Sequence, residues 1–241
     1  MPLRELLTRN VIVASGNYAF LALVDMCFRA LQPIFLSTPI ALGGLGLDPP
    51  AIGTIISLYG ILNSLFTVFF FARLVDCYGL KRVYLMGVSA SVPCFSLFPV
   101  INYLARNSTE GSGRLGAEVW VAVGLQVIMA VLICSCYGMC PAPRNLNYSW
   151  ISFLRLSVSG AVYIFIAGAA PNKASSGATN GLAQQSVSIV RAVGPALVSS
   201  LYSLSIDKDH HYMNGGLVYY VTVGLGLVSI WVGSLLPNRP R

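Results

Sequence analysis

Charged residues within apolar stretches are the first candidates for chemistry in this sequence of 241 residues. Asp25 and Arg29 stand four residues apart in one such stretch, so a helix would place them on one face. Two interpretations follow: a salt bridge that only lowers the cost of burying two charges, or a functional site. In the second interpretation Asp25 carries a proton, and Arg29 tunes that carboxylate or binds an anionic group.

Other polar side chains in apolar stretches are further candidates. Arg191 has no acidic residue close to it in the sequence, which indicates that it faces a cavity or another helix and lines a path for a solute. Four amides occupy similar positions and either form hydrogen bonds between helices, which is the simpler interpretation, or contact a solute. They belong to Gln126, Asn180, Gln184 and Gln185.

Enzyme chemistry finds no support in the sequence. The two histidines, His210 and His211, are adjacent in a polar segment without a third metal ligand, so we interpret them as solvated loop residues. The six cysteines lack metal-binding spacing and mostly lie in apolar stretches, where they act as small hydrophobes. We therefore predict no catalytic residues, no metal site and no cofactor, and a membrane enzyme is the least favoured of the functions considered.

The composition of the chain indicates whether these side chains lie in a soluble or a membrane protein. Apolar residues make up 56% of the chain and charged residues 10%, and the mean hydropathy is +0.72. A soluble domain needs about 25% charged residues, so the sequence predicts an integral membrane protein in contact with the lipid bilayer. The net charge of +7 does not indicate nucleic-acid binding, because the basic residues fall in short gaps between apolar runs rather than in one stripe.

Six apolar runs are long enough to cross a bilayer as helices. The N-terminus lacks the features of a signal peptide, so the first run is expected to remain in the protein. Gly177 and Gly181 predict close helix packing, and Gly194-Pro195 predicts close packing with a kink. The expected spans are Val11–Leu36, Ile52–Leu74, Val83–Leu104, one that begins at Val119, Gly177–Ile206 and Gly215–Leu236.

Basic residues predict the orientation of the spans. With six spans and a cytoplasmic N-terminus, eight Lys and Arg residues fall on the cytoplasmic side and three on the other, as the positive-inside rule requires. Both termini are then cytoplasmic, while plasma and vacuolar membranes both remain open. The sequon Asn107-Ser108-Thr109 falls in the predicted gap 107–116 on the far side, where Asn107 is a candidate glycosylation site.

The predicted loop between the second and third spans carries a distinctive pattern of charge. Asp76 precedes Gly79 by three residues and is flanked by Arg73 on one side and by Lys81 and Arg82 on the other. Glycine permits a tight turn there, and the carboxylate can accept hydrogen bonds from Arg73 or Arg82. An ordinary positive-inside loop is the alternative interpretation.

This loop, over 71–83, resembles the D-x-x-G-[RK]-[RK] signature of the major facilitator superfamily of transporters. It is similar to the copy between the second and third helices of the C-terminal half, and the segment 170–195 is similar to the fifth helix of that half in fungal drug and tetracycline-efflux-like members. The resemblance covers 1–138 and 161–241. It departs from the family in one large respect, because such transporters have twelve helices and only helices seven to twelve are represented.

The resemblance implies an all-α, six-helix membrane bundle, one half of the transporter fold, built from two inverted three-helix repeats. It also implies transport of a small organic solute, coupled to protons, by a single domain over 1–241 that needs an N-terminal six-helix half as its partner. The alternative is a truncated or non-transporting fragment that does not transport alone.

Residues 139–160 interrupt the fourth span and form an anomalous insert. Pro141, Pro143, Arg144 and Arg155 fall where an apolar helix is expected, and prolines break helices. Deleting the insert joins Gly138 to an apolar run and restores one span. Codons for the residues at its two ends permit splice donor and acceptor sequences, which predicts a retained intron.

Overall fold

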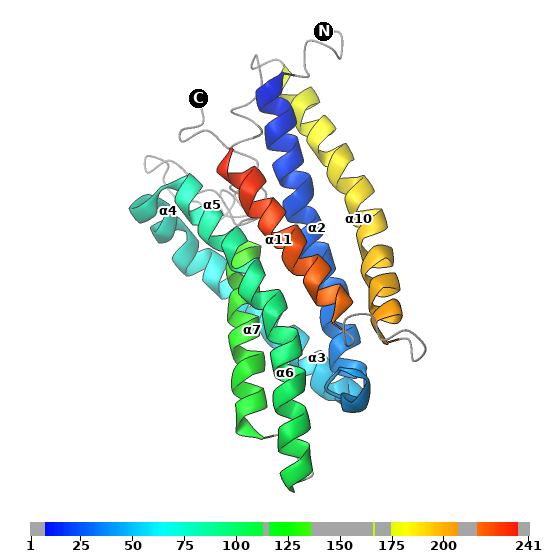
Figure 1. Ribbon diagram of the computed structural model, residues 1–241. Coiled ribbons are helices and arrows are strands. Elements are labelled where there is room, and N and C mark those ends of the chain that lie inside the picture. The colour runs from blue at the N-terminus through cyan, green and yellow to red at the C-terminus, as the bar shows by residue number, and fades with distance from the viewer. Residues whose placement is uncertain (1–7, 113–115, 136–165, 167–174, 207–215, 236–241) are drawn as a thin grey trace.

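The computed structural model describes residues 8–112, 116–135, 166, 175–206 and 216–235, and these residues form helices and connecting turns (Figure 1). The helices in chain order are α2 (Arg9–Ser37), η1 (Ile40–Leu42), α3 (Pro49–Phe66), the π-helical η2 (Thr67–Phe71), α4 (Ala72–Tyr78), α5 (Leu80–Ser89), α6 (Ser91–Ser112), α7 (Ala117–Ser135), α10 (Ser176–Ile206) and α11 (Leu217–Ser234).

Six stretches of helix in this part of the chain are long and apolar enough to cross a membrane. They coincide with the six predicted spans, so the predicted all-α fold with six membrane helices is confirmed. Residues 139–160 lie outside the described residues, and the predicted insert stays a prediction.

The third span differs from the continuous helix that the sequence predicts. It consists of α5 and α6, which are separated at Ala90. Pro93 explains the break, because a proline has no N–H to donate to the carbonyl four residues earlier and its ring clashes with that carbonyl, here that of Ser89. Backbone hydrogen bonds from Ala90 to Met86 and from Cys94 to Ala90 resume on either side.

The predicted gap after the third span begins too early. Helix α6 continues to Ser112, so Asn107 lies within the helix and not in a loop. The boundary was placed at the first polar residues, but a helix that extends past the hydrocarbon region can continue through them. The side chain of Asn107 is exposed.

Aromatic packing joins the helices around one core. The rings of Phe35 and Phe98 meet edge to face with centroids 4.9 Å apart, and Tyr219 stacks on Phe98 at 5.7 Å. Helix α2 packs against α10 and α11, α11 also packs against α5 and α6, and α7 packs against α3, α5 and α6 (Figure 1).

A tight connection fixes the start of α3 relative to α2 and α6. Gly44 is buried, and a Cβ there would collide with the carbonyl oxygens of Phe35 and Thr38. The amide of Asn102 on α6 donates to the carbonyl of Gly44 at 2.8 Å and to that of Ile40 at 3.2 Å. A buried amide therefore holds a turn that is open only to glycine.

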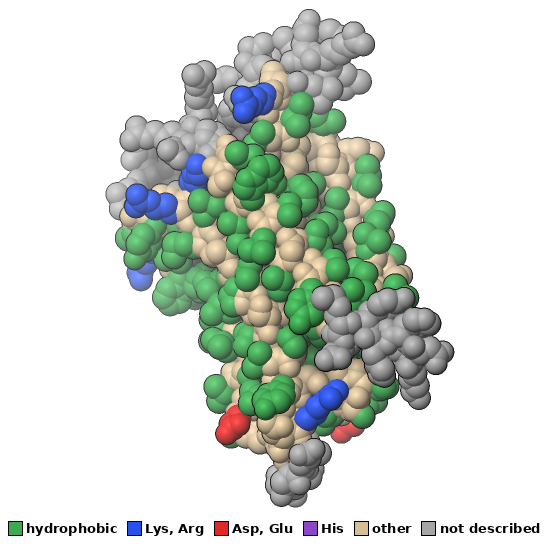
Figure 2. All heavy atoms as spheres, viewed as in Figure 1, with side chains coloured by type: hydrophobic (Ala, Val, Ile, Leu, Met, Phe, Trp, Pro, Cys, Tyr) green, Lys and Arg blue, Asp and Glu red, His purple; other side chains and the backbone are tan. Residues whose placement is uncertain are grey.

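Exposure is uneven among the helices. Helices α3 and α10 bury the smallest shares of their spans. The exposed residues of α10 include many polar ones beside apolar ones, whereas the large exposed residues of α7 after Glu118 and those of α11 are apolar. Figure 2 shows a hydrophobic middle to the visible face, with charged side chains gathered towards the two ends.

Candidate functional site

Asp25 and Arg29 form an ion pair halfway along α2. The guanidinium Nε of Arg29 donates to the carboxylate Oδ2 of Asp25 at 2.8 Å. The two side chains differ sharply in exposure, since 7% of Asp25 and 48% of Arg29 is accessible. The carboxylate is therefore inside the bundle, and the guanidinium covers it from the outside.

Helices α7 and α3 complete the surroundings of the pair. Arg29 also donates through Nη2 to the thiol sulfur of Cys134 on α7 at 3.5 Å. Phe28, the residue before Arg29, packs edge to face against Tyr59 of α3, with ring centroids 6.0 Å apart. The pair thus occupies the region where α2, α3 and α7 meet.

Helix α10 brings Gln184 and Arg191 alongside α2. Gln184 Nε2 donates to the hydroxyl of Tyr18 at 3.4 Å, and a Cβ at Gly194 would lie 3.5 Å from side-chain atoms of Leu23 and Met26. These contacts confirm close packing at Gly194 and show that α2 and α10 run in the same direction (Figure 1). Arg191 is exposed.

The remaining candidate residues lie apart from the ion pair. Gln126 is buried between α7 and α6, where its amide donates to the carbonyl of Cys94 at 3.4 Å. Asn180 is exposed near the start of α10, as is Gln185 one turn later. The structure therefore groups Asp25 with Arg29 and brings Gln184 to α2 at Tyr18, with Arg191 exposed about two turns further along α10, but it does not bring Gln126 to the same place.

The predicted packing role of Gly177 and Gly181 is not found in the described part of the chain. Both glycines are exposed, and a Cβ on either would have no described atom within 4 Å. The small-xxx-small spacing indicates only that close approach is possible, and α10 instead approaches α2 further along, at Gly194. His210 and His211 lie outside the described residues.

A second polar cluster was missed by the sequence analysis. Asn17 is almost fully buried, donates to the carbonyl of Val232 on α11 at 2.9 Å and accepts from the hydroxyl of Tyr84 on α5 at 3.1 Å. These bonds tie α2, α5 and α11 together. The signal that could have found it is a lone amide one residue from an aromatic hydroxyl within an apolar run.

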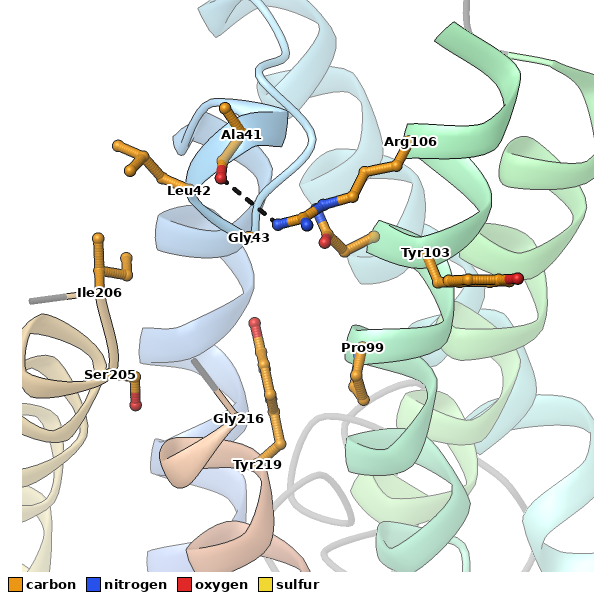
Figure 3. A pocket seen from close by; sticks show the side chains of 11 residues that line it. Ala41, Leu42, Gly43, Pro99, Tyr103, Arg106, Ser205, Ile206, Gly216 and Tyr219 are labelled. Carbon is orange, nitrogen blue, oxygen red and sulfur yellow. Dashed lines mark hydrogen bonds between the residues drawn. The ribbon is translucent and has the colours of Figure 1, made fainter. Parts of the chain in front are cut away.

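A cavity of about 600 Å³ opens at the end of the bundle where α6 and α10 end and α11 begins. Figure 3 shows Arg106 reaching across it towards η1, where its Nη2 lies 3.4 Å from the carbonyl oxygen of Ala41. The ring of Tyr219 stands between the helices that line it. This cavity lies far along the helices from the ion pair on α2.

Comparison with known proteins finds transporters that are similar to the chain. The chain is 24% identical over 242 residues to the major facilitator superfamily multidrug transporter mfsB of Aspergillus fumigatus, which covers 96% of the chain and 35% of that protein. It is 24% and 23% identical to the major facilitator-type transporters psiT2 of Psilocybe cubensis and Psilocybe cyanescens, over 92% and 90% of the chain. Over most of its length the chain is similar to part of these major facilitator transporters. It spans little more than a third of the length of these relatives.

No protein-family model and no solved structure matches the chain. The six described spans and the homology together show a multi-pass membrane protein. The fold is that expected for one half of a major facilitator superfamily transporter. The relatives are named as transporters, which points away from an enzyme.

The loop that resembles the major facilitator signature contains the predicted tight turn. Gly79 separates α4 from α5 with a φ of 82°, a conformation that side chains with a Cβ rarely adopt. Arg73 and Arg82 are exposed near this turn. The side chain of Asp76 is outside the described ones, so its hydrogen bonds to these arginines stay a prediction.

The described residues contain no group of three or more His, Cys, Asp or Glu side chains that could hold a metal ion. Of the cysteines that the structure describes, Cys27, Cys94 and Cys134 are buried and Cys77 is exposed. Cys27 and Cys94 pack among apolar side chains, as the sequence analysis expects, whereas the sulfur of Cys134 accepts from Arg29.

Proposed function

We propose that the chain is the C-terminal half of a major facilitator superfamily transporter, and that with an N-terminal six-helix half it moves a small organic solute across a membrane in exchange or symport with protons. The observation that carries the proposal is the ion pair of Asp25 and Arg29 within an apolar span. Ionisable side chains at such depth are costly and mark solute or ion pathways in membrane proteins. Homology to proteins named as transporters supports it.

In this proposal Asp25 is the proton carrier and Arg29 its switchable partner. Arg29 neutralises the ionised carboxylate through the 2.8 Å contact. When Asp25 is protonated the pair loses its charge attraction, and Arg29, which is half exposed, becomes free to bind another group. The carboxylate of Asp25 and the solute would then compete for one guanidinium, so that proton binding at Asp25 favours solute binding at Arg29.

The partner half would cover α10. An exposed face that meets lipid should be apolar, as the faces of α7 and α11 are, with Val121, Ile128 and Trp231 exposed. The exposed face of α10 carries Asn180, Gln185, Ser188, Arg191, Ser199, Ser200 and Ser203. Polar side chains in such numbers indicate contact with protein or water rather than with lipid tails.

Charge supports an orientation with both termini in the cytoplasm. Arg9, Arg73 and Arg82 are exposed at the end where α2 begins and α11 ends, while Asp48 and Glu118 are exposed at the other end. Figure 2 shows basic side chains gathered towards the first end and acidic ones at the second, where Arg106 is also exposed. The positive-inside rule assigns the first end to the cytoplasm.

Flux in proteoliposomes tests the proposal. The 241-residue chain is reconstituted alone and joined to an N-terminal six-helix half, and uptake of fluorescein, rhodamine 6G and Nile red is followed under an imposed pH gradient. We expect pH-driven flux of at least one dye with the joined protein, none with the chain alone, and loss of the flux in Asp25→Asn. If the joined protein is folded but moves no dye, the non-transporting alternative replaces the proposal.

A further inference from the structure

Charge in the middle of the described spans is not balanced. Away from the ends of the six spans, the described helices contain three charged side chains, those of Asp25, Arg29 and Arg191. Asp25 and Arg29 neutralise each other through their 2.8 Å contact. Arg191 has no acidic partner among the described residues, so a net charge of about +1 remains at this depth.

The two arginines belong to neighbouring stripes on parallel helices. Tyr18, Ala22, Asp25 and Arg29 follow each other on α2 at spacings of four, three and four residues, and therefore share one face. Gln184, Ser188 and Arg191 do the same on α10. The hydrogen bond from Gln184 to the hydroxyl of Tyr18 joins the two stripes at one end.

The depth of Arg191 follows from the same contacts. It lies three residues before Gly194, which faces Leu23 and Met26, and the two helices run in the same direction. At 1.5 Å per residue, Arg191 is within about two helical turns of Asp25 along the bundle. Arg191 and Arg29 are both exposed, so both guanidinium groups are accessible from outside the six-helix bundle.

Arg29 retains the capacity to bind a second acceptor. A guanidinium has five N–H donors, and the contacts to Asp25 and to the thiol of Cys134 use two of them. A cationic donor binds a carboxylate, sulfonate or phosphate group more strongly than a neutral acceptor, because both partners are charged.

We infer that the solute carried at this site is an organic anion, whose acidic group is bound by Arg191 with the outward N–H groups of Arg29. This rests on the proposed transport function and adds the chemical class of the solute. A cationic solute would be repelled by the net positive charge, and a neutral one would leave the charge of Arg191 uncompensated. The rival explanation is that a carboxylate of the partner half neutralises Arg191 permanently.

Binding to the 241-residue chain in nanodiscs tests the inference without any requirement for transport. The probes are 2-naphthoate, its neutral analogue 2-naphthamide and the cationic 2-naphthylmethylammonium, measured by equilibrium dialysis. We expect 2-naphthoate to bind at least about tenfold more tightly than either analogue, the difference that one charged hydrogen bond provides. Equal affinity for the three probes would overturn the inference.

Variants locate the binding. Arg191→Gln should remove the preference for 2-naphthoate, and Arg191→Lys should retain part of it, while the matched control Arg9→Gln, an exposed arginine at the start of α2, should leave it unchanged. Arg191 is exposed, so its loss should not impair folding, which circular dichroism and gel filtration check. A preference that survives Arg191→Gln, or that Arg9→Gln also removes, overturns the assignment.

The two proposals fail separately. If the joined protein moves rhodamine 6G but not fluorescein, the transport function stands and the anionic class of solute is wrong. If the chain binds 2-naphthoate through Arg191 but the joined protein moves no dye, the anion site stands and the transport function is wrong.

Discussion

Arg29 covers Asp25 from outside the bundle, and the 2.8 Å contact between Nε and Oδ2 joins a half-exposed cation to a buried anion. This asymmetry means that the two members of the pair depend on each other unequally. Without Arg29, the carboxylate is left buried and unpaired. Without Asp25, the half-exposed guanidinium is not left as an unpaired buried charge.

Removal of either member of the pair should therefore have different costs. We expect Arg29→Gln to lower the free energy of unfolding by roughly 3 kcal/mol and Asp25→Asn by about 1 kcal/mol, because only the first leaves an unpaired buried charge. The double variant Asp25→Asn with Arg29→Gln should be less destabilised than the sum of the two. Denaturant unfolding in detergent measures all three.

The same three variants separate a structural pair from a proton carrier. If Asp25 carries protons, the double variant of the joined transporter should be stable but lack pH-driven flux. Full recovery of flux in the double variant would show that the pair serves only stability.

The turn between η1 and α3 should be intolerant of small changes. Gly44→Ala places a Cβ against two carbonyl oxygens, and Asn102→Ala leaves the carbonyls of Ile40 and Gly44 without their donor. We expect each to cost about 1–3 kcal/mol in the free energy of unfolding. The control Ser96→Ala changes an exposed residue of the same helix and should have little effect.

Gly79 should be required for its backbone conformation alone. A Cβ there would meet no described atom within 4 Å, but the backbone conformation, with φ 82° and ψ 152°, costs other residues about 1–3 kcal/mol. Gly79→Ala should therefore lower the melting temperature, whereas Gly53→Ala, in an open position within α3, should leave it unchanged or raise it. Equal effects at the two positions would contradict the role assigned to the turn.

Labelling of single cysteines tests the orientation. In a background without other reactive cysteines, Ser234→Cys at the end of α11 should react with an impermeant maleimide from the cytoplasmic side only. Ser112→Cys at the end of α6 should react from the opposite side only, because α6 and α11 end at opposite faces of the bundle. Reaction of both from one side would rule the topology out.

The insert predicts two transcripts. If residues 139–160 come from a retained intron, amplification across this region should yield a shorter product that joins the codon of Gly138 directly to that of Ala161. Products that all retain the segment, from a gene without donor and acceptor sequences, would refute the prediction.

The fold was largely predictable, because span length and hydropathy respond to one strong constraint. Bilayer thickness sets the length of an apolar run, and α2, α10 and α11 begin and end within about two residues of the expected bounds. The break at Ala90 was not predicted, because hydropathy does not distinguish Pro93 from the apolar residues around it. Only the missing N–H of Pro93 and the clash of its ring with the preceding turn indicate the break.

The site was predictable in part. The spacing of Asp25 and Arg29 fixes their contact within a single helix, so the sequence alone suffices. The alignment of Arg191 with this pair depends instead on how α10 packs along α2, which no local pattern encodes. Asn102 and Asn17 were missed for the same reason, because their partners lie on other helices.

The contacts of α2 with α10 and α11 determine when during synthesis the bundle can assemble. The hydrogen bond from Asn17 to Val232 joins residues 215 positions apart, and the bond from Gln184 to Tyr18 joins residues 166 positions apart. Neither bond can form before the later residue has been synthesised. At about 5–20 residues per second, a ribosome needs roughly 10–40 s to reach Val232 after Asn17. During that interval the amide of Asn17 depends on its longer bond within α2, to the carbonyl of Val13 at 3.4 Å, and it gains its shorter bond only when α11 is inserted.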